Sequence, residues 1–327
     1  MTSTGPVRPL VGTFILLASA LGAHLLQGVE VGLLIQPAAF LLVVGSTLGM
    51  IIIGCGPGGL VGGLRALLFG SPDEQTDFGP LRRALYLVLH GAPLAGFVGA
   101  ILGFIHVLQS LDDPSHVGAA MAVNMVVLCY GVILAMIAYG LVVMVERRDG
   151  DGGASGAPTD EAEEGPTIGQ GVVGTVIVLA SIIVPHPLEG GDLMALLSVG
   201  AGLVVGGGTL GAVLIPGVSL GQSASRGTLR VAVQAALLAG IAGAILGTIH
   251  MLGHLDDPSM IGPGVALAYL ALFYGTIIAM IAHGWLARAG GGSEGSAGPP
   301  VGYSALYSAG ALVIVMAIFF GILAVVP

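Results

Sequence analysis

The sequence predicts an all-α polytopic membrane protein with nine spans: two tandem four-helix modules followed by one C-terminal transmembrane helix. Of its 327 residues, 55% are hydrophobic and only 8% are charged, and the mean hydropathy is +1.00. A soluble globular domain carries about 25% charged residues, so a soluble fold does not fit this composition. The apolar runs give the number of spans, and an internal repeat gives their grouping.

Nine apolar runs approach or exceed the length that crosses a bilayer as a helix, which is about 20 residues. The first run could also be read as a signal peptide, but it has a counterpart in the second half of the chain, where a signal peptide has no place. We therefore place the spans at 9–27, 32–54, 84–111, 115–145, 168–184, 192–215, 229–255, 259–287 and 303–326.

The arginines predict the orientation of these spans. Positively charged residues are enriched in cytoplasmic loops. With the N-terminus in the cytoplasm, every Arg of the chain falls on the cytoplasmic side, whereas the outer turns carry acids such as Glu30, Asp112 and Glu189. We therefore expect a cytoplasmic N-terminus and a C-terminus on the outer side.

The repeat is clearest around two acidic hairpins. The segment GAILGFIHVLQSLDDP at 99–114 recurs as GAILGTIHMLGHLDDP at 243–258, an offset of 144 residues. The same offset relates YGVILAMIAYG at 130–140 to YGTIIAMIAHG at 274–284. Two copies of one helical unit in one chain are therefore expected.

Further upstream the offset changes to 162, because VVGSTLG at 43–49 matches VGGGTLG at 205–211. The difference reflects a shorter cytoplasmic connection in the second copy. The stretch between the copies is acidic and rich in glycine, which is typical of a flexible linker. The expected organisation is a first module at 1–147, a linker at 148–167, a second module at 168–288, a flexible stretch at 289–302 and a C-terminal helix at 303–327.

Each repeat contains a G-x-x-x-G motif, formed by Gly99 and Gly103 in the first copy and by Gly243 and Gly247 in the second. This spacing places both glycines on one helix face, where helix backbones approach closely in a membrane. We expect these glycines to serve helix packing, with a pore-lining face as the alternative.

The LDDP sequences predict helix-to-helix turns at the membrane surface. Asp113 and Asp257 suit the N-cap of the helix that follows, and Pro114 and Pro258 suit its first turn. The carboxylates also favour the positive end of the helix dipole. An ion-attracting vestibule is compatible with this capping role.

The polar residues within spans are few. His106 and His250 lie near the outer ends of their spans, where an interfacial role or a place on an ion path are both open. Asn124 lies deeper and is expected to form an interhelical hydrogen bond. His90, near the inner end of its span, is interpreted as interfacial. No Asp, Glu, Lys or Arg lies within the spans as drawn.

The paired segments GAILGFIHVLQSLDDPSHVGAAMAVNMVVLCYG and GAILGTIHMLGHLDDPSMIGPGVALAYLALFYG resemble the third and fourth spans of the MotA/TolQ/ExbB proton channel family. The LDDP turn followed by Tyr-Gly is closest to MotA. The resemblance implies a homo-oligomeric ring in a bacterial inner membrane. It also implies a MotB/TolR/ExbD-like single-span partner that supplies the essential carboxylate.

The resemblance also identifies positions on the ion path. The family carries hydroxyls where this chain has Ala100, Val127 and Leu128, and again Ala244, Ala271 and Leu272. Their absence predicts a path without sodium coordination, since hard cations prefer oxygen ligands. The connections at 55–83 and 216–228 are too short for a large rotor-contacting cytoplasmic domain. The complete set of candidates is Ala100, His106, Asn124, Val127, Leu128, Ala244, His250, Ala271 and Leu272.

We therefore expect a subunit of a proton-driven motor or channel complex. A non-conducting scaffold derived from the same family is the alternative, and an unrelated transporter is the weakest hypothesis, because broken helices and buried charges are not evident. An enzyme is not expected, since no nucleophile–base set converges. No cofactor, metal or nucleic acid is expected, given two distant cysteines, Cys55 and Cys129, and no lysine.

Overall fold

The computed structural model describes residues 35–69, 78–109, 114–151, 168–188, 191–214, 226–252 and 258–289. In these residues the chain is helical and contains no strand. Seven of the described helical segments are long and apolar enough to cross a membrane. They coincide with seven of the nine predicted spans, so the prediction of an all-helical, multi-pass membrane protein is confirmed. The predicted spans 9–27 and 303–326 lie outside the described residues.

The helix boundaries follow the apolar runs closely, and the described arginines lie near the helix ends. The elements are α2 (Pro37–Phe69), α3 (Gly79–Gln109), α4 (Pro114–Asp151), α5 (Ile168–Ile183), α6 (Pro185–Leu188), the 3-10 turn η2 (Leu193–Leu196), α7 (Val199–Leu214), α8 (Arg226–Leu252) and α9 (Pro258–Ala289).

Helix α2 is kinked at Gly56, whose φ of 72° and ψ of 168° lie outside the helical region. A positive φ of this kind favours glycine, which has no Cβ to clash. The stretch Pro37–Gly56 before the kink is the part long and apolar enough to span the membrane. The kink therefore ends the span close to the predicted boundary at residue 54 and turns the rest of α2, with Arg65, in a new direction.

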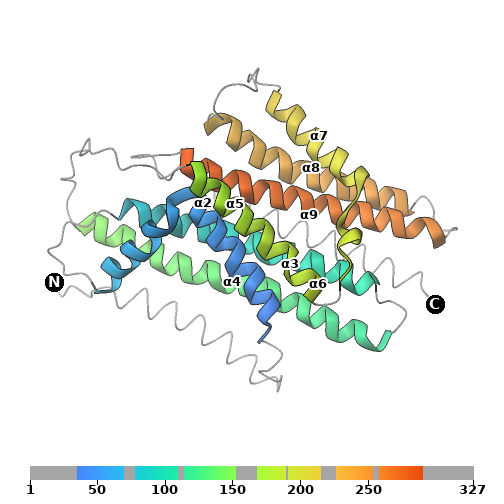
Figure 1. Cartoon of the computed structure of the whole chain (residues 1–327), viewed down its shortest axis with the longest axis horizontal. Coiled ribbons are helices and arrows are strands. Elements are labelled where there is room, and N and C mark those ends of the chain that lie inside the picture. Colours follow the sequence, from blue (N-terminus) through green and yellow to red (C-terminus); the bar gives the residue numbers. More distant parts are fainter. Residues whose placement is uncertain are drawn as a thin grey trace.

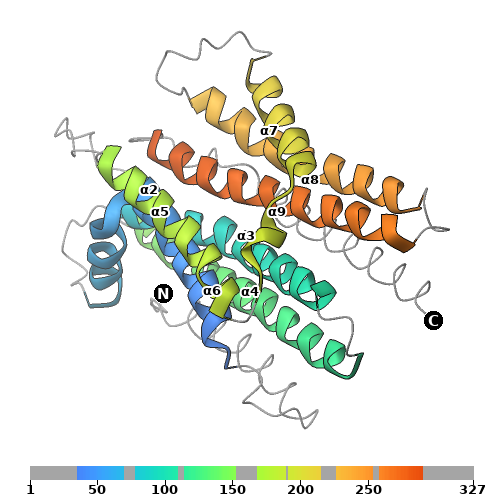
Figure 2. The same ribbon diagram turned by 45° about the vertical axis from the view of Figure 1, so that its right-hand side comes forward.

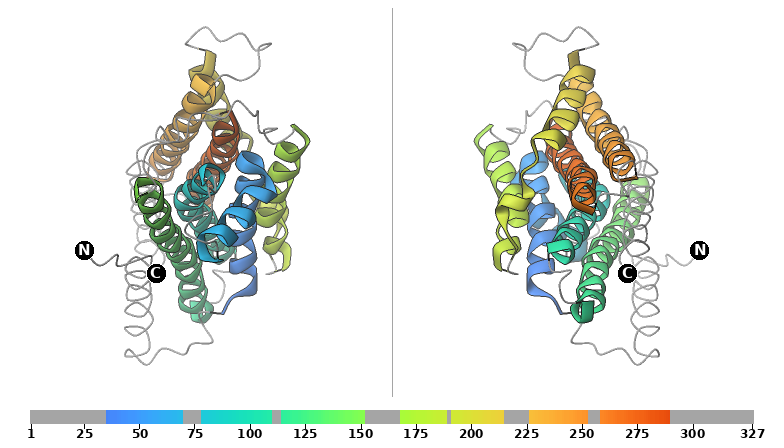
Figure 3. Two further views of the ribbon diagram at one scale, coloured as in Figure 1. Left: turned by 90° about the vertical axis from the view of Figure 1, so that its left-hand side faces the viewer. Right: turned by 90° about the vertical axis from the view of Figure 1, so that its right-hand side faces the viewer.

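Helix α3 lies at the centre of the bundle (Figure 3). It packs against α2 and α4 of the first half of the chain and against α9 of the second half. Helices α7 and α8 pack on the other side of α9, and α5 packs on the outer side of α2 (Figures 1 and 2). The two halves of the chain are thus joined through the packing of α9 on α3 and α2 and through that of α5 on α2.

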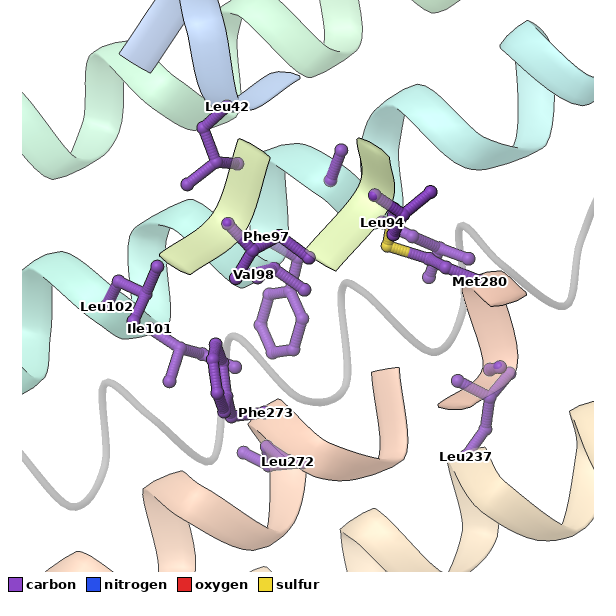
Figure 4. Packing of buried hydrophobic residues seen from close by; sticks show 14 of the residues in the cluster. Leu42, Leu94, Phe97, Val98, Ile101, Leu102, Leu237, Leu272, Phe273 and Met280 are labelled. Carbon is purple, nitrogen blue, oxygen red and sulfur yellow. The ribbon is translucent and has the colours of Figure 1, made fainter. Parts of the chain in front are cut away.

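The apolar core is continuous across both halves. Phe97 and Ile101 of α3 point toward Leu272 and Phe273 of α9, and Leu94 points toward Met280 (Figure 4). Burial in a membrane does not remove these side chains from water, so the gain comes from close packing rather than from the hydrophobic effect.

The contact of α5 with α2 depends on small residues. A Cβ placed on Gly49 of α2 would lie 2.8 Å from the carbonyl oxygen of Gly174 of α5, so only glycine permits this approach. One turn away, the hydroxyls of Ser46 and Ser181 are hydrogen-bonded at 2.8 Å. Small residues with an interhelical hydrogen bond are the usual means of helix association in lipid.

Candidate functional site

The tyrosines of the two Tyr-Gly pairs lie within α4 and α9, and each binds the backbone just before the start of another helix. The Tyr130 hydroxyl accepts a hydrogen bond from the Gln36 backbone N–H at 3.1 Å, just before α2. The Tyr274 hydroxyl accepts one from the Ser198 backbone N–H at 3.0 Å, just before α7. The tyrosines differ by 144 residues and their partners by 162, the same two offsets that relate the sequence segments.

The glycines after these tyrosines set the spacing of the two helix hairpins. A Cβ on Gly131 would lie 2.5 Å from the Ala92 carbonyl oxygen, so α4 touches the backbone of α3. A Cβ on Gly275 would lie 2.6 Å from the Ala236 carbonyl oxygen, so α9 touches α8 in the same way. Gly275 is the counterpart of Gly131, and Ala236 is the counterpart of Ala92, each at the offset of 144 residues.

The glycines of the G-x-x-x-G motifs also lie in these helix contacts. A Cβ on Gly99 would collide with Val127, and one on Gly243 would collide with Ala271. A Cβ on Gly247 would collide with the backbone of Gly264 and Ala268. Gly103 is only half-buried.

The positions expected on an ion path lie inside the packed bundle. Ala100, Val127, Ala244, Ala271 and Leu272 are buried, and Leu128 is half-buried. Leu272 belongs to the cluster between α9 and α3 (Figure 4). The structure therefore brings Val127 to Gly99 and Ala271 to Gly243, but each pair lies within its own hairpin.

The hairpin ends that carry the LDDP sequences are described in part. His106 and His250 are half-buried in the last turns of α3 and α8. His186 of α6 is buried, and its ring Nε2 lies 3.4 Å from the Asp192 carbonyl oxygen.

The other predicted site residues are the hairpin caps and Asn124, and the structure describes them only in part. The two helices begin at Pro114 and Pro258. Asp113 and Asp257 lie outside the described residues, and Asn124 lies in α4 where the side chains are not described.

A pair of histidines at the boundary between the halves was missed by sequence reasoning. His90 of α3 is buried and its ring centroid lies 5.7 Å from that of His283 of α9, which is also buried. Its Nδ1 lies 2.7 Å from the Tyr86 carbonyl oxygen, and its Nε2 is buried without a hydrogen-bond partner among the described residues. The interpretation of His90 as interfacial is wrong, because α9 covers the face of α3 on which it lies.

A polar chain connects this pair to the arginine-bearing end of the bundle. The Tyr86 ring stacks on His90 with centroids 6.2 Å apart, and the Tyr86 hydroxyl donates a 2.8 Å hydrogen bond to Glu146 of α4. Glu146 is exposed, whereas His90 and His283 are buried.

The two hairpins built on these contacts also match known proteins. Both match the model of the MotA/TolQ/ExbB proton channel family. The matched residues are 78–149, which contain α3 and α4, and 221–290, which contain α8 and α9.

Individual MotA/TolQ/ExbB-type relatives match over short stretches. Motility protein A of Aquifex aeolicus (strain VF5) is 48% identical over 40 residues, which is 12% of this chain and 16% of that protein. Chemotaxis protein PomA of Vibrio alginolyticus is 41% identical over 44 residues, or 14% of this chain and 17% of that protein. The chain thus matches about a sixth of the length of each curated relative. No solved structure gives a significant match.

Proposed function

We propose that this chain is a membrane subunit of a MotA/TolQ/ExbB-like proton-driven motor or channel complex in a bacterial inner membrane. The observation that carries the proposal is the match of both membrane hairpins, α3–α4 and α8–α9, to one proton channel family. Tyr130 and Tyr274 make equivalent hydrogen bonds, and Gly131 and Gly275 make equivalent backbone contacts, which supports a tandem duplication of one channel module.

The complex needs a second protein that carries a carboxylate. Among the described spans, the only acidic residue is Glu146, at the inner end of α4. Proton relays through a bilayer use ionisable groups inside it. We therefore assign the central proton carrier to a MotB/TolR/ExbD-like single-span partner, in a complex without a large rotor-contacting cytoplasmic domain.

The histidine pair is the contribution of this chain to the same path. Of the histidines in the described spans, His90 lies farthest from a span end. It stacks on Tyr86, whose hydroxyl donates a hydrogen bond to Glu146, on the side that the arginines place in the cytoplasm. The proposal therefore places His90 between the partner's carboxylate and the cytoplasm.

Reconstitution in liposomes containing a pH-sensitive dye tests the proposal. The protein alone should hold an imposed proton gradient as long as empty liposomes do. Addition of the partner should collapse the gradient, and a partner with its membrane carboxylate changed to the amide should not. Rapid leakage through the protein alone would show that the chain contains a complete path and would refute the partner requirement.

The same flux assay also tests whether sodium is needed and whether His90 takes part in conduction. The flux should be equal with and without sodium, because Ala100 and Ala244 stand where the family has hydroxyls. His90→Gln should lower the flux, whereas Gln234→Asn at the equivalent exposed position of α8 should not. An unchanged flux in His90→Gln would remove the histidine pair from the path.

A non-conducting scaffold is the second candidate. It is favoured by the burial of Ala100, Ala244, Ala271 and Leu272 in helix contacts within one chain. The same assay separates the two functions, since a scaffold stays closed to protons even when the partner is bound.

A further inference from the structure

The last part of α2 lies beyond its membrane span. The span ends at Gly56, where the positive φ interrupts the helix, and the chain then continues as a helix to Phe69. Residues 57–69 form the α2 tail. Figure 2 shows that the tail runs in a different direction from the rest of α2.

The kink lies at the depth of two interfacial residues of α9. A Cβ on Gly54, two residues before the kink, would lie 3.3 Å from the Gly284 carbonyl oxygen and 3.1 Å from the Ala287 Cβ. Trp285 and Arg288 are the next residues of α9, and the Arg288 guanidinium lies 5.1 Å from the Trp285 ring centre. Trp is enriched at membrane–water interfaces and Arg on their cytoplasmic side, so the tail begins at the inner membrane surface.

The sequence of the tail places different residue types on its two sides. At 3.6 residues per turn, all the Leu and Val positions share one side of the helix, here called the Leu face. These positions are Leu60, Val61, Leu64, Leu67 and Leu68. All the Gly and Ala positions share the opposite side. They are Gly58, Gly59, Gly62, Gly63 and Ala66.

The protein leaves the described residues of the tail uncovered. Val61, at the edge of the Leu face, is 69% exposed. A Cβ on Gly58 or Gly62 would meet nothing within 4 Å, and Arg65 is exposed. An exposed apolar residue at the inner membrane surface therefore has lipid, rather than another helix, as its available neighbour.

The second copy has no comparable sequence. Helix α7 ends at Leu214, and the following stretch PGVSLGQSAS at 216–225 has no run of Leu at helical spacing. The repeated α3–α4 and α8–α9 hairpins therefore form both with and without such a tail. The tail belongs to the first connection alone, which points to a role separate from hairpin packing.

We infer that the α2 tail lies in the inner interface of the lipid bilayer, with its Leu face toward the acyl chains and its Gly face toward water. An amphipathic helix of this kind lies in the plane of the interface, with its apolar face about 5–10 Å into the boundary between headgroups and acyl chains. Arg65 lies between the two faces, where its long side chain reaches the lipid phosphates. The bilayer surface thus holds the inner end of α2 and the start of the connection to α3.

The fluorescence of a single tryptophan locates each face of the tail, whatever the protein conducts. Trp285 is the only tryptophan of the chain, so Trp285→Phe gives a background without tryptophan. In this background Leu64→Trp labels the Leu face. Gly62→Trp labels the opposite face, where a Cβ meets nothing within 4 Å. The full chain is reconstituted in vesicles of phosphatidylethanolamine and phosphatidylglycerol, with bromine either near the headgroup or deep in the acyl chains.

The emission of Leu64→Trp should be blue-shifted, and lipid brominated near the headgroup should quench it more strongly than deeply brominated lipid. Gly62→Trp should emit further to the red and should be quenched by iodide in the water. Val61→Trp, at an exposed position, should repeat the Leu64→Trp result and replaces that variant if it does not elute as the native protein does.

Three results would overturn the inference. Equal quenching of Leu64→Trp and Gly62→Trp by iodide would place the whole tail in water. Blue-shifted emission that neither brominated lipid quenches would place the Leu face against protein. Stronger quenching by the deep bromines would place the tail inside the hydrocarbon core rather than at its surface.

Discussion

In the α3–α4 hairpin, Gly131 lies against the carbonyl oxygen of Ala92, and in the α8–α9 hairpin Gly275 lies against that of Ala236 in the same way. Around these equal contacts the surroundings differ, since Leu94 and Ile101 of α3 are buried while their counterparts in α8, Leu238 and Ile245, are exposed. The comparison shows that a helix hairpin is specified by its own glycines. Its neighbours, in contrast, are set by its place in the chain.

The largest difference between the copies in the stability lost on substitution is expected at Phe104 and its counterpart Thr248. Phe104→Ala should lower the free energy of unfolding by about 3 kcal/mol, because it leaves a cavity against Tyr269. Thr248→Ala should cost less than about 1 kcal/mol, since Thr248 bonds only to its own helix, at Ala244. Unfolding in mixed micelles measures both. Equal losses would mean that α9 does not cover α3 as described.

A smaller difference in the stability lost on substitution is expected at Gly49 and its counterpart Gly211. Gly49→Val should cost about 2 kcal/mol, because the new side chain collides with Val178 and with the Gly174 backbone. Gly211→Val should change the stability of the single chain by about 0.5 kcal/mol or less, since the site is open. Thermal unfolding in detergent distinguishes them, and a severe loss in Gly211→Val would contradict the open face of α7.

The smallest effect is expected at the serine pair between α2 and α5. Ser46→Ala and Ser181→Ala remove one interhelical hydrogen bond, which in membranes averages about 0.6 kcal/mol. Gly208, the counterpart of Ser46, has no hydroxyl, so the second copy lacks this bond. A double-mutant cycle should give a coupling energy of that size. A coupling of zero would show that the two hydroxyls do not interact.

The helices themselves could be predicted from the sequence. Seven described spans coincide with apolar runs, because chain length and apolar content decide whether a helix crosses a bilayer. The sequence also indicates some helix ends. Helices α4 and α9 begin at Pro114 and Pro258, and Arg288 lies next to the last residue of α9.

The contacts between the two halves could not be predicted. In helices that are apolar on all sides, the distribution of apolar residues does not show which face contacts another helix. The packing of α9 on α3 therefore could not be predicted from the sequence. His90 and His283 are far apart in sequence and are not equivalent positions in the repeat, which hid their contact. The available signal was His90, which has no histidine counterpart in the second copy, and the sequence analysis interprets it as interfacial.

The contact of α5 with α2 also affects biosynthesis. The ribosome completes α2 long before α5, and domains generally fold in the order of their synthesis. The face of α2 that carries Gly45 and Gly49 therefore enters the bilayer before its partner α5 has been made. A chain that stops after α4 lacks this partner, so a helix encoded in the second half completes this contact of the first.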